Sequence, residues 1–213
     1  MKTLYLVRHG ETDHNAAGLA MGQTDVPLNE LGRRQARQTA AWLRRYPIER
    51  IISSDMMRAT ATAEHLADTL GLPIETDPRL RELSFGIFEG KKISDCEEEY
   101  PDIVSRWHSG EYDFAAPGGE TRRELMARTG DMLDVLMDAP EEHIAVFTHG
   151  GTLNALHTHI IESTHPSPRE HIHRVFRFSN ASVSMALHTG KLWRFHVVNS
   201  TFHLEDEPRQ LLY

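Results

Sequence analysis

Three short apolar runs in the sequence are each followed by side chains that can bind or transfer a phosphoryl group. After 3–7 come Arg8 and His9, after 50–53 come Ser54 and Arg58, and after 143–147 comes His149. Arginine offers planar donors that match phosphate oxygens two at a time. Histidine is partly neutral near pH 7 and can attack phosphorus without a separate base. Two arginines and two histidines therefore favour phosphoryl transfer.

These side chains can meet only if the three runs are neighbouring strands of one sheet. Apolar residues at helical spacing fill the segments between them, at 31–45, 55–70 and 122–137, and a further helix is expected beyond Gly151. Strands that alternate with helices predict an α/β fold with a largely parallel sheet. Ligands bind beyond the carboxyl ends of such strands. The glycine-bearing loops after His9 and His149 run into helices and would add backbone N–H donors for an anion.

Capping and turn residues give some of the boundaries. Asp55 stands where a helix N-cap is expected, and Gly71 where the same helix would end. The segments 181–188 and 191–198, separated by Thr189-Gly190, predict a β-hairpin. Its edge strand could pair two subunits into a homodimer. The length of 213 residues predicts one domain over 1–213.

The segment 84–117 breaks the regular pattern with several glycines and prolines. We expect a lid there, with one helix around 93–107 and with Trp107 and Phe114 in the core of the lid. Lys91-Lys92 is interpreted as a solvated charge pair. Cys96, the single cysteine, lies in an acidic stretch that disfavours its thiolate, so we expect it to be inert.

The bulk composition excludes several classes of function. A formal net charge of −8 argues against nucleic acid as the main partner, because binding to its backbone needs a basic face. No apolar run approaches the ~18 residues of a membrane span, and the apolar stretch 4–7 is too short for the core of a signal peptide. We therefore expect a cytoplasmic protein without a membrane partner, and the lone cysteine fits a reducing compartment. A small phosphorylated metabolite remains the expected partner.

No metal or other cofactor is expected. The pairs His157-x-His159 and His171-x-His173 are the closest approach to a metal-ligand pattern among 14 histidines. Alternate residues of a helix face different directions, so these pairs do not predict a shared ion. No cluster of carboxylates accompanies the arginines and histidines of the expected pocket.

Ordered motifs along nearly the whole chain resemble the histidine phosphatase superfamily, in its phosphoglycerate mutase-like branch. They are Arg8-His9-Gly10-Glu11-Thr12 with Asn15, Gly22-Gln23-Thr24-Asp25, Ser53-Ser54 with Arg58-Ala59, Leu80-Arg81-Glu82 leading into Phe88-Glu89-Gly90, Pro117-Gly118-Gly119-Glu120, and Thr148-His149-Gly150-Gly151. The resemblance is greatest to small bacterial phosphatases such as α-ribazole phosphatase or a broad-specificity phosphatase. It implies a three-layer sandwich with a mainly parallel central sheet between helices.

The resemblance also implies a role for each site residue. His9 would be the nucleophile and form a phosphohistidine, with Arg8, Arg58 and His149 around the transferring group. Glu82 would protonate the leaving oxygen and then accept a proton from water. Glu11, Glu89 and Asp25 are the other carboxylates that could take this acid role in place of Glu82. The residues implied in phosphate or substrate binding are Asn15, Gly22, Gln23 and Gly150, the glycines through backbone N–H groups.

The activity that this implies is hydrolysis of a phosphomonoester without a metal. The chain lacks part of the lid of typical cofactor-dependent phosphoglycerate mutases, and a reduced lid favours access of water. Asp55 and Phe88 depart from the residues that relatives often have, proline and tryptophan. Two alternatives stay open: a cofactor-dependent phosphoglycerate mutase, and a phosphate-binding regulatory pseudo-enzyme. The candidate substrates are α-ribazole phosphate, phosphoserine, sugar phosphates and phosphoglycerate derivatives, and the segment 84–117 would select among them.

Overall fold

Six strands form one sheet at the centre of the protein, whose computed structural model describes residues 1–164 and 176–204. The sheet order is β3-β2-β4-β1-β5-β6. The strands are β1 (Lys2–Arg8), β2 (Arg50–Ser53), β3 (Ile74–Thr76), β4 (His143–Thr148), β5 (Val183–His188) and β6 (Trp193–Ser200). The four strands from β3 to β1 run parallel, and β5 and β6 are antiparallel additions at one edge. The predicted mainly parallel sheet and the hairpin are thus confirmed, whereas β3 was not predicted.

The register of the sheet brings three strand ends together. Arg8 at the end of β1 lies opposite Thr148 at the end of β4, and Ser53 of β2 lies opposite Phe147. The residues that follow these strands therefore emerge side by side at one edge. The site predicted from the sequence needed this alignment, because its side chains follow these three strands.

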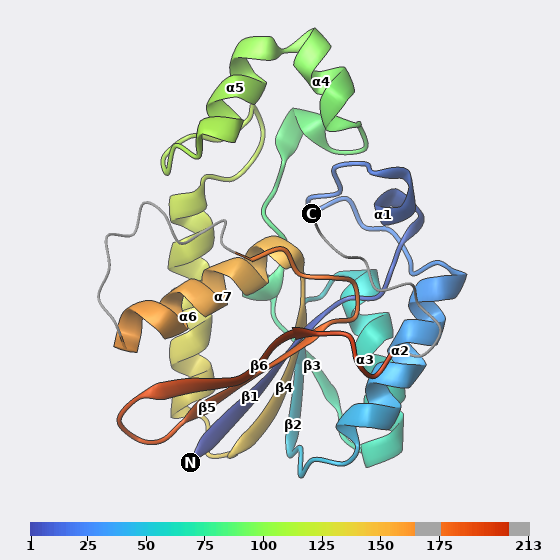
Figure 1. Ribbon diagram of the computed structural model, residues 1–213, viewed down its shortest axis with the longest axis vertical. Helices are drawn as coiled ribbons and strands as arrows, with labels where there is room; N and C mark the ends of the chain where they lie inside the picture. Colours follow the sequence, from blue (N-terminus) through green and yellow to red (C-terminus); the bar gives the residue numbers. More distant parts are fainter. Residues whose placement is uncertain (165–175, 205–213) are drawn as a thin grey trace.

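Helices cover both faces of the sheet (Figure 1). They are α1 (Asp13–Ala17), α2 (Glu30–Leu43), α3 (Met57–Leu70), α4 (Ile93–Glu99), α5 (Pro101–Ser109), α6 (Arg122–Asp138) and α7 (Gly150–Thr164), with short 3-10 turns at Pro78–Leu80 and Gly86–Phe88. No helix in the described part of the chain is long and apolar enough to cross a membrane.

Alternate residues of the strands supply two separate cores. Leu4 and Leu6 of β1 pack in the cluster that includes Leu136 of α6 and Leu156 of α7. Tyr5 and Val7 face the opposite way, toward α2 and α3. The two-residue period of a strand produces this division, and the result is the predicted three-layer α/β sandwich.

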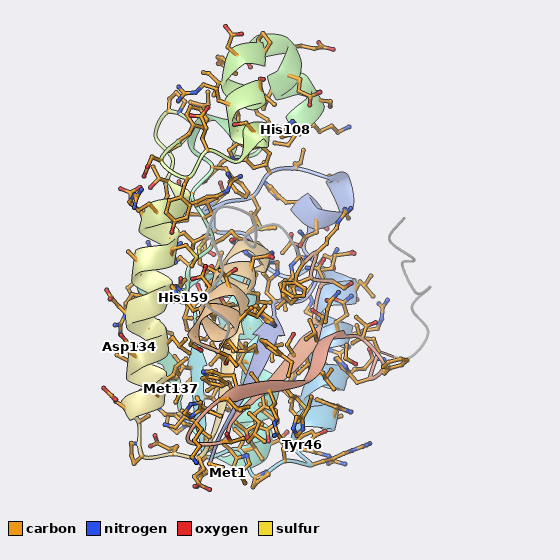
Figure 2. All side chains as sticks on the ribbon, turned by 60° about the vertical axis from the view of Figure 1, so that its left-hand side comes forward. Met1, Tyr46, His108, Asp134, Met137 and His159 are labelled. Atoms are coloured by element: carbon orange, nitrogen blue, oxygen red, sulfur yellow. The ribbon has the colours of Figure 1, made fainter. Side chains whose placement is uncertain are left out.

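α6 shows the same division along a helix. In Figure 2, Asp134 points outward from α6, and it is exposed. Met137, three residues on, packs against the core cluster of α6 and α7. His159 of α7 reaches across to α6, where its Nε2 lies 2.8 Å from the Met126 carbonyl oxygen.

The start of α3 differs from the prediction. Asp55 is not its N-cap: that position is held by Met56, which makes no side-chain capping bond. Asp55 instead accepts hydrogen bonds from Arg81, with 2.8 Å from Nε to Oδ1. The Met57 amide is satisfied by Asp25 Oδ1 at 2.9 Å. A capping oxygen thus comes from a distant loop, because the local aspartate is engaged by an arginine.

The segment 84–117 extends beyond the strand ends that carry the site (Figure 1). It holds two helices, α4 and α5, where one was predicted, because Pro101 starts a new helix after Tyr100. Phe88, Cys96 and Val104 form a small core of their own, with Trp107 packed against it. The expected lid-core position of Trp107 is confirmed. Phe114 does not belong to that core, and its ring stacks under the Arg106 guanidinium at 4.3 Å.

Candidate active site

His9 follows β1 and is oriented by main-chain groups. Its backbone N–H donates to the Thr148 carbonyl at 2.9 Å. Its ring Nδ1 lies 2.7 Å from the Gly10 carbonyl oxygen, so Nδ1 carries the hydrogen and donates it. The lone pair is then on Nε2, which forms no hydrogen bond with any described residue. The side chain is 2% exposed. This tautomer leaves a nitrogen with an unshared lone pair at the edge of the sheet.

His149 follows β4 and faces His9. The two ring centroids are 5.1 Å apart. Nδ1 of His149 accepts a hydrogen bond from Arg58 Nε at 3.2 Å, so its Nε2 holds the hydrogen and donates to Ser54 Oγ at 2.9 Å. Three strand ends thus meet through these contacts, as the sequence predicted.

Arg58 lies under the site and is fully buried. Its Nη1 donates to the Thr24 carbonyl at 2.9 Å and its Nη2 to the Gly22 carbonyl at 2.7 Å. Burial lowers the pKa of Arg58 to about 10, which still leaves it charged at pH 7. The arginine therefore joins α3, the loop 22–24 and His149 while it keeps a positive charge in the site.

Arg8 supplies a second positive charge from the end of β1. Its Nη1 donates to the Phe178 carbonyl at 2.6 Å. Its Nε is buried, and no described atom accepts its hydrogen. A methyl group added at Gly150 would lie 3.6 Å from this Nε. Burial lowers the pKa of Arg8, and the carboxylate of Glu82 acts in the opposite direction. An unpaired guanidinium N–H beside a glycine at a helix start is suited to an anion.

Glu82 lies beside the start of α7. Its Oε2 accepts from the Gly151 N–H at 3.0 Å and its Oε1 from the Leu83 N–H at 2.9 Å. A methyl group at Gly151 would come within 2.3 Å of Oε1. Gly151 therefore permits the close approach that puts this carboxylate next to Gly150 and Arg8.

Both histidines of the site are held neutral. Burial, with added repulsion from Arg8 and Arg58, holds the pKa of His9 well below 6.5. Burial, followed by the charge of Arg58, does the same to the pKa of His149. Positive charge in the site is thus concentrated on the arginines, and His9 keeps its lone pair at neutral pH.

The predicted phosphate-binding residues take up different positions. Asn15 uses Oδ1 to accept from the Thr12 N–H at 3.2 Å, and its Nδ2 has no described partner. Gly22 contributes its carbonyl to Arg58, and a methyl group there would meet Glu89 at 2.2 Å. Gln23 donates from Nε2 to the Glu82 carbonyl at 3.0 Å. Gln23 therefore holds the backbone of Glu82.

The competing carboxylates have partners elsewhere. Glu89 Oε1 accepts from the backbone N–H groups of Gln23 and Phe85 at 3.0 and 2.9 Å. Glu11 Oε1 accepts from Asn29 Nδ2 at 2.9 Å, and Asp25 caps α3. Their contacts tie loops together, whereas Glu82 is the carboxylate held at the start of α7, beside Gly150 and Gly151.

Two supporting residues were not predicted. Asn180 donates from Nδ2 to the carbonyls of His9 and Gly10 at 3.2 and 3.3 Å, and to Asn15 Oδ1 at 3.1 Å. Arg128 of α6 donates to the Glu82 carbonyl at 3.0 Å and pairs with Glu120 at 2.6 Å. The Gly-Gly-Glu motif ending in Glu120 was a signal for the second, and nothing in the sequence singled out Asn180.

The paired histidines do not share a ligand position. His157 is buried, with Nδ1 donating to the Leu153 carbonyl at 2.7 Å, while His159 reaches toward α6. His171 and His173 lie outside the described residues. Among the residues that are described, no group of three or more His, Cys, Asp or Glu side chains could hold a metal ion.

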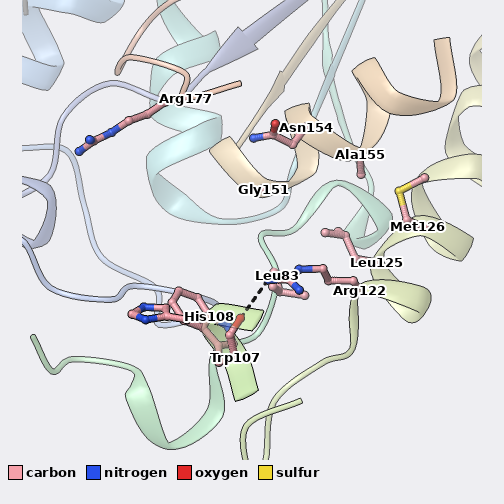
Figure 3. Close-up of a pocket in the computed structure, with 10 residues that line it drawn as sticks. All are labelled: Leu83, Trp107, His108, Arg122, Leu125, Met126, Gly151, Asn154, Ala155 and Arg177. Carbon is pink, nitrogen blue, oxygen red and sulfur yellow. Dashed lines mark hydrogen bonds between the residues drawn. The ribbon is translucent and has the colours of Figure 1, made fainter. Parts of the chain in front are cut away.

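A pocket of about 610 Å³ opens next to Glu82 (Figure 3). Leu83 and Gly151, whose backbone N–H groups both donate to Glu82, are among its lining residues. Trp107 of α5 lines it from the segment 84–117, so that segment borders the site. Arg122 Nη2 donates to the Trp107 carbonyl at 3.3 Å and links α6 to α5.

Comparison with known proteins gives one consistent family. The model of the histidine phosphatase superfamily (branch 1) matches residues 4–201. "Probable phosphoglycerate mutase GpmB" of Yersinia pestis (strain Pestoides F) is 37% identical over 194 residues, which cover 91% of this chain and 88% of that protein.

Solved structures agree with this family. YhfR of Bacillus stearothermophilus superposes with a TM-score of 0.86 at 28% identity, covering 96% of this chain and 100% of that one. A mycobacterial glucosyl-3-phosphoglycerate phosphatase in complex with VO3 has a TM-score of 0.83 at 29% identity, with 94% and 100% covered. The α-ribazole phosphatase of Shigella flexneri has a TM-score of 0.84 at 27% identity, with 93% and 96% covered. These matches confirm the fold class and the phosphatase enzyme class expected from the sequence, and the chain belongs to the histidine phosphatase superfamily (branch 1).

Proposed function

We propose that this protein hydrolyses the phosphate monoester of a small metabolite through a phosphohistidine on His9, without a metal ion. The observation that carries the proposal is the tautomer of His9: Nδ1–H is bound to the Gly10 carbonyl, and Nε2 keeps its lone pair. That nitrogen lies in a site with Arg8, Arg58 and His149. Cationic donors around a neutral nucleophile are what transfer of a phosphoryl dianion requires.

In the first step, Nε2 of His9 attacks phosphorus, and the bond from phosphorus to the ester oxygen breaks. Glu82 gives its proton to the departing oxygen, so the alcohol leaves neutral. Arg8, through its unpaired Nε, and Arg58 stabilise the charge on the equatorial oxygens. The positions of Glu82 and Arg8 on one side of Gly150 support this division of work.

In the second step, water attacks the phosphorus of the phosphohistidine. Glu82 now accepts a proton from that water, and the bond from phosphorus to Nε2 breaks to release inorganic phosphate and neutral His9. The 610 Å³ pocket beside Glu82 has room for water and, in this proposal, would admit it to the intermediate once the alcohol has left. This access supports hydrolysis over return of the phosphoryl group to a bound intermediate.

The test is hydrolysis of p-nitrophenyl phosphate in EDTA by wild type and His9→Ala. We expect His9→Ala to lose about a thousandfold or more in kcat, because no second nucleophile replaces the covalent step. His65→Ala, in α3 outside the site, is the matched control and should retain wild-type activity. Acid-labile phosphohistidine trapped by rapid quench should appear in wild type only. Equal rates of hydrolysis for wild type and His9→Ala would refute the assignment of His9 as the nucleophile.

A phosphoglycerate mutase is the second candidate, because the Yersinia relative that is 37% identical carries that name. A mutase would convert 3-phosphoglycerate to 2-phosphoglycerate faster than it releases phosphate, and 2,3-bisphosphoglycerate would stimulate it. Both products can be followed in one reaction by phosphorus NMR. Phosphate release that outpaces isomerisation supports the phosphatase, and binding of phosphate without any turnover would support a pseudo-enzyme.

A further inference from the structure

The pocket beside Glu82 has a composition that is unusual for a protein with a net charge of −8. Its ten lining residues include two arginines and no acidic residue. Leu83, Leu125, Met126 and Ala155 give it an apolar wall. A volume of about 610 Å³ lies in the range that takes a ring-sized organic group, and is larger than a three-carbon ester needs.

The two arginines have different surroundings. Arg122 donates to the Trp107 carbonyl and so belongs to the connection between α5 and α6. Arg177 is exposed, and its guanidinium has no hydrogen bond or ion pair with any described residue. In Figure 3 it lies on the opposite side of the pocket from Met126. Figure 3 shows the Arg177 guanidinium at the margin of the pocket, directed outward from the other lining residues, so a ligand would reach it with the end that extends to that margin.

Arg177 also lies within electrostatic reach of the phosphoryl site. Its charge contributes to lowering the pKa of Arg8, after the larger effect of burial. The charges of these two guanidinium groups thus repel each other, and neither group forms an ion pair with a described carboxylate. A ligand with a phosphoryl group at Arg8 and a second negative charge at Arg177 would relieve this repulsion.

We propose that the substrate is a phosphate monoester of an apolar or aromatic alcohol that carries a carboxylate, with the carboxylate bound by Arg177. This inference rests on the proposed function and names the substrate class of the same site. The apolar wall would take the body of the alcohol. One guanidinium balances one negative charge and matches a carboxylate in two parallel hydrogen bonds, whereas a second phosphate dianion would need further cations.

Binding of phosphonates, which cannot be hydrolysed, tests the pocket without the chemistry. Titration calorimetry on the full chain would compare methylphosphonate, phenylphosphonate, and the 3- and 4-carboxyphenyl and 3- and 4-carbamoylphenyl phosphonates. We expect phenylphosphonate to bind about tenfold or more tightly than methylphosphonate, from burial of the ring. At least one carboxyphenyl isomer should bind about tenfold more tightly than its near-isosteric carbamoyl partner.

Arg177→Gln should abolish the preference for carboxylate over carbamoyl, and it should weaken the carboxyphenyl phosphonates about tenfold more than it weakens phenylphosphonate or the carbamoyl partners. Arg194→Gln, an exposed arginine of β6, removes the same charge and should keep the preference. Equal affinity of wild type for both carboxyphenyl isomers and their carbamoyl partners would overturn the proposal. Equal weakening of every phosphonate by Arg177→Gln would also overturn it, because Arg177 would then contact the phosphoryl group itself.

Failure of the proposed function has a separate signature. In that case p-nitrophenyl phosphate is not hydrolysed in a His9-dependent way, whatever the phosphonate affinities are. Conversely, His9-dependent hydrolysis with no gain from the ring or from the carboxylate refutes the substrate class alone.

Discussion

The surroundings of His9 determine both the tautomer and the pKa of its ring. Its Nδ1–H is bound to a carbonyl of the adjacent residue at 2.7 Å, and burial beside two arginines lowers its pKa. A free histidine has a pKa of about 6.5 and would be largely protonated at pH 5.5. At His9 the lowered pKa means that the neutral, nucleophilic form persists below pH 6.5.

We therefore expect the free protein to keep His9 neutral at pH 6, as the Nδ1–H tautomer. Nitrogen-15 NMR of the imidazoles, assigned by comparison with His9→Gln, would show it. Inorganic phosphate should move the titration of His9 upward, because an anion beside the ring stabilises the imidazolium. An imidazolium signal for His9 above pH 6.5 in the free protein would contradict this description of the site.

At the scale of elements, the start of α7 determines where Glu82 lies. The Gly151 N–H holds one carboxylate oxygen at 3.0 Å, and the absence of a side chain at Gly151 makes room for the other. The helix terminus thus positions a carboxylate that belongs to a loop more than sixty residues earlier in the chain.

Gly151→Ala should displace the Glu82 carboxylate and lower kcat about tenfold or more. The fold should survive with a loss of less than about 1 kcal/mol, because the clash is with the end of a flexible side chain. A double-mutant cycle with Glu82→Gln would measure this by kcat. We expect the two losses to be strongly non-additive, since both act through one carboxylate. Additive losses would show that Gly151 acts elsewhere.

α6 contributes a clamp on the same loop. Arg128 donates to the carbonyls of Arg79, Arg81 and Glu82 and pairs with Glu120, and both members of the pair are largely buried. Arg128→Gln should lower the free energy of unfolding by about 3 kcal/mol, because it leaves the Glu120 carboxylate unpaired. It should also reduce kcat through the position of Glu82. Urea unfolding and steady-state kinetics would measure the two effects.

Arg123→Gln, on the same helix, is the matched control. Arg123 pairs with Asp113 at the surface, with both side chains more than 60% exposed. Its loss should leave the free energy of unfolding nearly unchanged and should not affect kcat, because solvent screens an exposed ion pair. If both variants lost similar amounts of stability and of kcat, the buried contacts of Arg128 would contribute no more than the exposed pair of Arg123.

At the scale of the whole molecule, a buried histidine joins three segments of one core. The ring of His157 in α7 stacks on the ring of Phe195 in β6, with their centroids 4.9 Å apart. Its centroid is 4.7 Å from that of Phe178, whose carbonyl accepts a hydrogen bond from Arg8. Its Nε2 is buried without a described partner. Burial lowers the pKa of His157 to about 4. In the unfolded chain a histidine has a pKa of about 6.5. Between about pH 6.5 and 4 this side chain is therefore protonated in the unfolded chain and neutral in the folded one.

This difference makes folding stability depend on pH. Between about pH 6.5 and 4 the unfolded state binds more protons, so the free energy of unfolding falls as the pH falls through that window. His157→Phe should be within about 1 kcal/mol of wild type at pH 7, and its stability should fall less steeply by about 1.4 kcal/mol per pH unit in acid. Urea unfolding at pH 7, 6 and 5 would test it, and equal slopes would contradict it.

The fold class could be predicted from the sequence, and so could the meeting of the three strand ends that carry His9, Ser54 and His149. Apolar runs that end in Arg8-His9, Ser53-Ser54 and Thr148-His149 could be recognised because buried strands and their chemistry-bearing ends are local patterns. The pairing of these ends followed from one rule, that parallel strands align their carboxyl ends in one sheet. The structure bore out their convergence, with His9 and His149 in contact.

Contacts between distant segments could not be predicted from the sequence and became visible only in the folded chain. The engagement of Asp55 by Arg81, the capping of α3 by Asp25 and the hold of Asn180 on His9 each join residues more than twenty positions apart. The tautomers of His9 and His149 and the pocket under α5 belong to the same class. Local secondary-structure propensity does not predict such partners. A side chain can hydrogen-bond only to groups within about 3.2 Å, and for these residues folding is what brings the partner that close.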